Sequence, residues 1–115
     1  MQIGYLEIVT NDVVGVCATY AATYGCVFGE PEPFLGGART TALAGGGKLG
    51  VRPPMRADEA PVVRPYFLVE DAAAAVEAAG KSGAEIAVPP MPLPGQGTCA
   101  IFLGGGNDHG IWQNE

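Results

Sequence analysis

The feature of this sequence that most limits its fold is a repeat with a period of about sixty residues. Each half opens with a segment rich in β-branched and aromatic residues, 3–10 and 64–69, which favours a strand. Each then reaches residues that can cap a helix, Asn11 or Asp12 in the first half and Asp71 in the second. The same order of elements is therefore predicted twice.

Two helices are expected after these caps. The first runs through 13–24 and ends at Gly25, and the second is the Ala-rich segment 72–83. Three short strands are predicted to follow each helix, punctuated by glycine and proline. They cover 26–29, 38–46 and 48–53 in the first half, and 85–90, 97–104 and 108–113 in the second.

The two halves are joined by a polar, proline-rich stretch that indicates a connector. A chain of 115 residues is of the size of one domain. We therefore predict a single α+β domain over 1–115, made of a βαβββ unit at 1–54 and a second βαβββ unit at 62–115.

Charge and hydropathy exclude several classes of protein. The formal net charge is −6 with six basic residues, whereas phosphate backbones are bound by clustered Lys and Arg, so no nucleic-acid partner is expected. No apolar run reaches the roughly 18 residues of a membrane span, and no signal peptide is recognised. A cytoplasmic protein without a membrane partner is predicted. Cys17, Cys26 and Cys99 form no CxxC pair and are expected to be buried thiols.

The second half resembles the vicinal oxygen chelate superfamily, which includes glyoxalase I, extradiol dioxygenases and bleomycin-resistance proteins. The resemblance rests on RPYFLVED, on VPPMPLPGQG and on GNDHGIWQ, which look like a glyoxalase-related subgroup; YLEIVTND and TYAATYGCVFG resemble the first unit. It implies the glyoxalase/bleomycin-resistance fold, in which two βαβββ units form a curled half-barrel around a cavity. It also implies a homodimer, with or without exchange of units.

The resemblance further implies where a metal would be held. Metal-dependent members take His and Glu ligands from the first and last strand of each unit. Those positions fall here on Tyr5, on Arg64 or Pro65, and on Gly50 and Gly110. None of them supplies an imidazole or a carboxylate, and arginine disfavours a cation. No metal and no other cofactor are therefore expected, and the two glycines are expected to leave open space.

Strand alternation supplies candidates for the cavity lining. If Tyr5 faces inward, so does Glu7, whereas Leu6 and Ile8 pack on the helix. By the same alternation His109 faces away from Gly110. The predicted ligand-binding residues are Tyr5, Glu7, Arg52, Arg64, Tyr66 and Trp112.

Two of these residues have alternative interpretations. Glu7 pairs with an arginine and fixes the fold, or it takes up a proton and serves as a general base. Trp112 stacks on a planar ligand, or it belongs to the core or to a dimer interface.

We interpret the sequence as a metal-free protein of the glyoxalase/bleomycin-resistance family that binds a small, partly planar ligand. The alternatives are a metal-independent isomerase or lyase with Glu7 as general base, and a protein module whose cavity is vestigial.

Overall fold

The computed structural model describes residues 1–115 and divides into two compact units. One unit is Leu6–Val63, and the other combines Met1–Tyr5 with Arg64–Glu115. The strand β1 (Ile3–Val9) is divided between them: its first residues, up to Tyr5, belong with Arg64–Glu115, and the rest belong to Leu6–Val63. Strands and helices are both present in each unit, which confirms the α+β class. Neither helix is long and apolar enough to cross a membrane.

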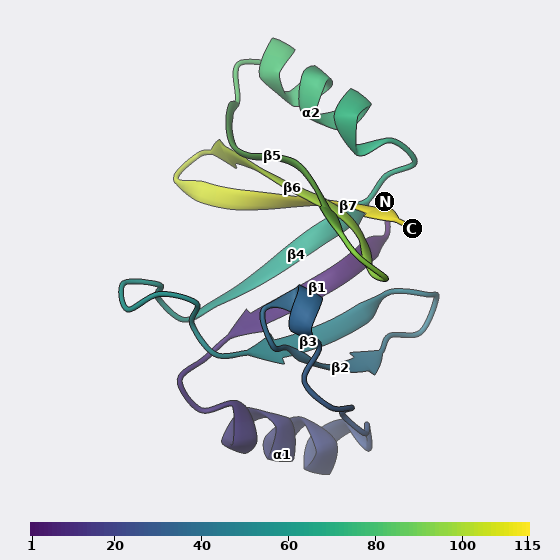
Figure 1. Ribbon diagram of the computed structural model, residues 1–115, viewed down its shortest axis with the longest axis vertical. Helices are drawn as coiled ribbons and strands as arrows, with labels where there is room; N and C mark the ends of the chain where they lie inside the picture. Colours follow the sequence, from purple (N-terminus) through teal and green to yellow (C-terminus); the bar gives the residue numbers. More distant parts are fainter. The chain divides into compact units, whose positions relative to one another are not determined.

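The Leu6–Val63 unit contains α1 (Val13–Tyr24), the short 3-10 helix η1 (Pro33–Leu35), β2 (Arg39–Ala42) and β3 (Lys48–Arg52). Its sheet has the order β2-β3-β1, with β2 and β3 antiparallel. Helix α1 lies on one face of this sheet (Figure 1).

The strand predicted at 26–29 is absent, so this half is βαββ and the predicted βαβββ pattern is wrong here. Gly25 ends α1 in the left-handed conformation with φ 70°. Beyond it, the Gly29 N–H donates to the Thr40 carbonyl at 2.9 Å, close to β2. Val27, two residues before Gly29, is exposed. The segment therefore touches the sheet edge without becoming a strand.

Helix α1 is held by its caps and by its packing, because Gly15 and the β-branched residues in it are poor helix formers. The Asp12 side chain accepts a hydrogen bond from the Gly15 N–H at 3.0 Å, as predicted for a cap. The buried face of α1 packs on the sheet through an apolar core. This core contains Ile8, Cys17, Leu49 and Val51, with Leu6, Val13, Val16, Tyr20, Phe28 and Leu43 around them.

This core confirms which side chains of β1 and β3 face α1 and which face the other side of the sheet. Leu6 and Ile8 both pack toward α1, so Glu7 between them lies on the opposite face. Leu49 and Val51 likewise pack toward α1, which places Arg52 with Glu7. Burial raises the pKa of the Cys17 thiol, and all three cysteines are free.

The other unit contains β4 (Val62–Leu68) from Arg64 onward, α2 (Ala72–Lys81), β5 (Glu85–Leu93), β6 (Gly97–Gly104) and β7 (Asn107–Asn114). The predicted βαβββ order is confirmed in this half. Its sheet has the order β1-β4-β7-β6-β5, in which β4 and β7 are parallel and the β7-β6 and β6-β5 pairs are antiparallel. Helix α2 lies against β5, β6 and β7 (Figure 1).

Helix α2 begins where the sequence predicts. The Asp71 side chain accepts a hydrogen bond from the Ala74 N–H at 3.1 Å, and Ala72, Ala100 and Ile111 form the core beneath the helix. Ile111 lies on β7 and points toward α2, so its neighbours Gly110 and Trp112 lie on the other face of the sheet. That second face carries the candidate site.

Candidate functional site

Three aromatic side chains of the Met1–Tyr5/Arg64–Glu115 unit pack together on the face of the sheet opposite α2. The ring centroids of Tyr5 and Trp112 are 5.2 Å apart, those of Tyr5 and Tyr66 are 5.8 Å apart, and Tyr66 meets Trp112 edge-on at 6.4 Å. All three residues are buried. We call them the aromatic cluster. Such contacts add to the burial energy of the rings themselves.

Glycines make the aromatic cluster possible. A Cβ atom added at Gly4 would lie 2.6 Å from the Trp112 ring, and one added at Gly110 would lie 2.5 Å from the Tyr66 ring and 2.7 Å from the Pro65 carbonyl oxygen. The prediction of open space at Gly110 is therefore wrong. The glycine permits the Tyr66 ring to lie directly over the backbone of β7, and the ring fills the space.

A charged pair lies on the same face, next to the aromatic cluster. Arg64 precedes Tyr66 by two residues on β4, so both side chains point to one side of the sheet. The Arg64 Nη2 atom lies 3.3 Å from the Asp108 Oδ2 atom on β7. The Arg64 side chain is 11% exposed and that of Asp108 is 48% exposed. This ion pair thus has a mostly buried cation and a well-solvated anion.

Strand register defines which residues surround this pair. Gly110 lies opposite Tyr66 on one side and opposite Ile101 on the other. Asp108 lies opposite Leu103, and both Ile101 and Leu103 are half-buried. We call this surface the Arg64 face, and its residues are Arg64, Tyr66, Ile101, Leu103, Asp108 and Gly110.

The Leu6–Val63 unit carries a different polar arrangement around Arg52, whose side chain is 2% exposed. The Arg52 Nε atom donates to Glu7 Oε2 at 2.8 Å. Its two terminal nitrogens donate to the two carboxylate oxygens of Glu59 at 2.9 and 2.8 Å. Nη1 also donates to the Pro53 carbonyl at 3.1 Å. We call Glu7, Arg52 and Glu59 the arginine cluster.

The protonation states of the arginine cluster follow from these contacts. Burial acts to lower the pKa of Arg52, but its hydrogen bonds to Glu59 and Glu7 outweigh burial and raise the pKa. The hydrogen bonds from Arg52 lower the pKa of Glu59 from 4.5 to about 2, against burial and with help from the Met55 N–H. Arg52 and Glu59 are therefore charged at neutral pH. The interpretation of Glu7 as an arginine partner agrees with this geometry.

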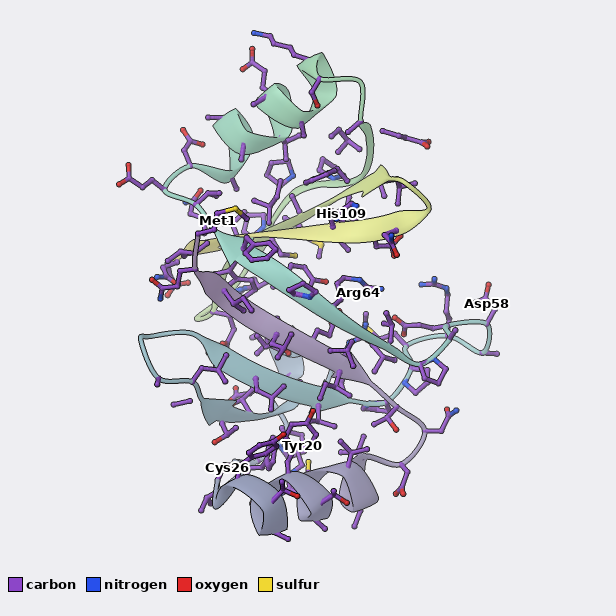
Figure 2. All side chains as sticks on the ribbon, turned by 180° about the vertical axis from the view of Figure 1, so that it is seen from behind. Met1, Tyr20, Cys26, Asp58, Arg64 and His109 are labelled. Atoms are coloured by element: carbon purple, nitrogen blue, oxygen red, sulfur yellow. The ribbon has the colours of Figure 1, made fainter.

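Glu59 is the main residue that the sequence interpretation missed. It lies in the polar connector, seven residues after Arg52, where an acidic side chain has no periodic pattern to set it apart. The Met55 N–H donates to the same carboxylate at 2.7 Å, so Glu59 folds the connector back onto β3. Asp58 beside it points outward from the same loop (Figure 2).

His109 lies on the α2 side of β7, away from the Arg64 face (Figure 2). Its ring stacks on Phe102 at a centroid distance of 5.0 Å, and Phe102 packs against the core beneath α2. The Nε2 atom lies 2.9 Å from the Gly104 carbonyl oxygen. The predicted orientation of His109 is confirmed.

The positions at which the resemblance places metal ligands do not fit a metal ion. In the Met1–Tyr5/Arg64–Glu115 unit, the Tyr5 ring belongs to the aromatic cluster, Arg64 carries a positive charge, and Gly110 is covered by the Tyr66 ring. No group of three or more His, Cys, Asp or Glu side chains is arranged to hold a metal. We therefore derive no chemistry through one.

Comparison with solved structures identifies the fold. A hypothetical protein from Bacillus halodurans C-125 superposes with a TM-score of 0.80 at 11% identity, over 99% of this chain and 94% of the other. The methylmalonyl-CoA epimerase from Mycobacterium tuberculosis gives a TM-score of 0.78 at 12% identity, over 99% and 88% of the two chains. The chain has the glyoxalase fold. This confirms the predicted fold class.

A third solved structure was determined with a bound small molecule. The Streptomyces coelicolor methylmalonyl-CoA epimerase Q60A, in complex with 2-nitronate-propionyl-CoA, has a TM-score of 0.76 at 19% identity, over 99% of this chain and 97% of the other. No protein-family model matches the sequence, and neither does any curated protein. At these identities the similarity establishes the fold and leaves the activity to the residues of the site.

The six predicted site residues thus fall into two groups. Tyr5, Arg64, Tyr66 and Trp112 come together on the sheet of one unit, and Glu7 and Arg52 are joined in the arginine cluster of the other. Their role as ligand contacts stays a prediction.

Proposed function

We propose that this protein binds a small, partly planar ligand without using a metal ion. The observation that carries the proposal is the composition of the Arg64 face, where half-buried apolar side chains adjoin a buried aromatic ring and an arginine. Small-molecule sites commonly combine apolar and aromatic walls with a few charged groups. No residue in this set needs to react, so binding alone accounts for its chemistry.

The comparisons support this proposal at the level of the fold. A structural neighbour is named as a complex with 2-nitronate-propionyl-CoA, so the same architecture accommodates a small organic ligand there. For this chain we propose a cytoplasmic protein that forms a homodimer, with no nucleic-acid or membrane partner. Glu7 and Arg52 of the Leu6–Val63 unit also remain proposed ligand contacts.

The proposal is tested with a panel of planar aromatic carboxylic acids and their primary amides. Trp112 is the one tryptophan of the chain and contacts Tyr66, so its emission reports on a ligand placed against that ring. We expect saturable changes in Trp112 emission, with binding confirmed by calorimetry. A panel without any binder overturns the proposal. Stoichiometric Zn, Ni, Mn or Fe in protein purified without chelators contradicts its metal-free part.

A metal-independent isomerase or lyase is the second candidate. It is favoured by the neighbours named as epimerases, since epimerisation requires a proton to be removed and returned. The Glu7 carboxylate is the proposed general base, and its hydrogen bond from Arg52 would have to open first. Turnover of a bound compound by the wild type, lost in Glu7→Gln with ligand affinity retained, supports this candidate. Binding with unchanged ligand after prolonged incubation supports the binding protein.

A further inference from the structure

Arg64 differs from the solvated cations of the chain in both burial and neighbours. The side chains of Arg56 and Lys81 are 67% and 77% exposed, and both pair with acidic residues close to them in sequence. Arg64 is mostly buried and pairs across the sheet with Asp108. It also adjoins the apolar residues of the Arg64 face, where water competes less for a guanidinium than it does at the surface.

The Arg64–Asp108 contact has the geometry of an exchangeable pair. Its N–O distance is 3.3 Å and its acidic partner is half exposed. Arg52, by contrast, holds Glu59 with two parallel hydrogen bonds of 2.9 and 2.8 Å, and that carboxylate is almost fully buried. A solvated carboxylate recovers its hydration when it leaves an arginine, so replacing Asp108 costs little. An incoming carboxylate that bonds through both oxygens gains a stronger interaction.

The apolar part of the face sets the shape of the molecule that fits. The row formed by Tyr66, Gly110 and Ile101 lies two residues along the strands from the row formed by Arg64, Asp108 and Leu103. Two residues advance a strand by about 7 Å. A ligand with a carboxylate on Arg64 therefore places a flat apolar group over the Tyr66 row when a short spacer separates the two. trans-Cinnamate has this form, whereas benzoate is shorter.

We propose that Arg64 and Asp108 form an anion site, in which the carboxylate of a planar aromatic acid replaces Asp108 on the guanidinium. This inference rests on the proposed function and names its ligand class, an aryl carboxylate with a spacer of about two carbons. Asp108 occupies the site as an internal competitor until the ligand arrives. The net charge of −6 disfavours anions over the protein as a whole, so binding of a carboxylate depends on the local charge of this arginine.

The test measures dissociation constants for trans-cinnamate, trans-cinnamamide and benzoate by calorimetry at neutral pH. We expect cinnamate to bind about tenfold tighter than its amide, the size of one charge-assisted hydrogen bond. Benzoate is expected to bind more weakly than cinnamate. Equal affinity for acid and amide overturns the anion site and leaves the proposed function standing. Absence of binding by all three and by the wider aromatic panel overturns both.

Two variants locate the site, each with a check of folding by circular dichroism. Asp108→Asn removes the competitor from an exposed position, so cinnamate affinity should rise several-fold while cinnamamide affinity stays constant. Asp58→Asn is the matched control, because it removes the same charge from an exposed ion pair with Arg56. Its cinnamate affinity should equal that of the wild type. Equal gains in both variants would show only a change in overall charge and would overturn the site.

Arg64→Lys keeps the charge but loses the planar fork that bonds both carboxylate oxygens. We expect its preference for cinnamate over cinnamamide to fall to about threefold or less. An undiminished preference in folded Arg64→Lys, together with unchanged cinnamate affinity in Asp108→Asn, excludes Arg64 as the anchor.

Discussion

Strands β3 and β7 are the last strands of the two halves of the repeat. Each carries a buried side chain at the equivalent position, but the two side chains have opposite chemical character. On β3 the position two residues after Gly50 is Arg52, which is buried in a cluster of charges. On β7 the position two residues after Gly110 is Trp112, which is buried among aromatic rings. One backbone pattern thus supports either an electrostatic or an apolar filling.

The difference teaches that the two halves depend on different conditions. The arginine cluster depends on the ionised Glu59 carboxylate, whose pKa Arg52 lowers, and removing one partner leaves buried charge uncompensated. The aromatic cluster depends on shape and buried area, which do not change with pH. Substitutions and acid should therefore have different effects on stability at β3 and at β7.

The largest effect is expected from Trp112→Ala. The substitution removes a fully buried ring that contacts Tyr5 and Tyr66 and leaves a cavity, which should lower the free energy of unfolding by about 4 kcal/mol. Urea denaturation measures the loss, and the control Trp112→Phe should lose less than half as much. A loss for Trp112→Ala below that of Gly110→Ala would contradict the importance of the aromatic cluster.

Arg52→Met should be next, with a loss of about 3 to 4 kcal/mol, because it leaves the buried Glu7 and Glu59 carboxylates without their cation. Adding Glu7→Gln and Glu59→Gln to this variant should recover part of the stability. If the triple variant is no more stable than Arg52→Met, uncompensated charge is not the cause.

Acid should weaken the arginine cluster selectively. The pKa of Glu59 is lowered from 4.5 to about 2 in the folded protein, so its contribution is complete above pH 4.5 and is lost as the pH falls toward 2. The loss is about 3 kcal/mol from this group. The free energy of unfolding, measured between pH 6 and pH 2.5, should fall less steeply with decreasing pH for Glu59→Gln than for the wild type. Parallel curves would show that Glu59 is not held at a low pKa.

Gly110→Ala should cost about 2 kcal/mol, since its Cβ atom would meet the Tyr66 ring and the Pro65 backbone oxygen. Gly104→Ala on β6 is the matched control: its Cβ would make only ordinary contacts, at 3.6 Å or more, with the His109 ring. Thermal unfolding of both variants measures the difference. Equal stability of the two would show that Tyr66 moves aside freely.

The smallest effect is expected from Asp108→Asn, which should change stability by less than about 1 kcal/mol because the pair it breaks is partly exposed. Chemical denaturation at low and high salt checks this. A loss comparable with that of Arg52→Met would remove the contrast between the two arginines.

The phase of the strands and the helix starts could be predicted from the sequence because they depend on local patterns. The alternation of Leu6, Glu7 and Ile8 placed Glu7 opposite α1, and Asp71 marked the start of α2. The closing strands of both halves were found for the same reason. The side-chain partners of these strands were harder to predict, because the partners come from other segments of the chain.

Two errors and one omission show where local patterns stop being sufficient. Residues 26–29 have strand-like composition, but only Gly29 bonds to β2, through its N–H to the Thr40 carbonyl and through its carbonyl, which accepts from Arg39 Nε. The bare backbone at Gly110 suggested room for a ligand, whereas the ring of Tyr66 occupies it; Tyr66 lies on the neighbouring strand β4, which is far from β7 in the sequence. Glu59 was missed because its partnership with Arg52 depends on how the connector folds.

The division of β1 between the two units bears on the order in which the chain can fold. Residues 1–5 belong with 64–115, and the Gln2 carbonyl accepts a hydrogen bond from the Leu68 N–H at 2.7 Å. Residues 1–5 must therefore wait for strands made about sixty residues later, whereas Leu6–Val63 is contiguous. Closing so long a loop is slow relative to local contacts. The N and C termini lie near one another (Figure 1). Joining them and opening the chain between Pro61 and Val62 would make residues 64–115 and 1–5 contiguous and would separate only Val62 and Val63 from the Leu6–Val63 unit. Such a circular permutant should refold faster.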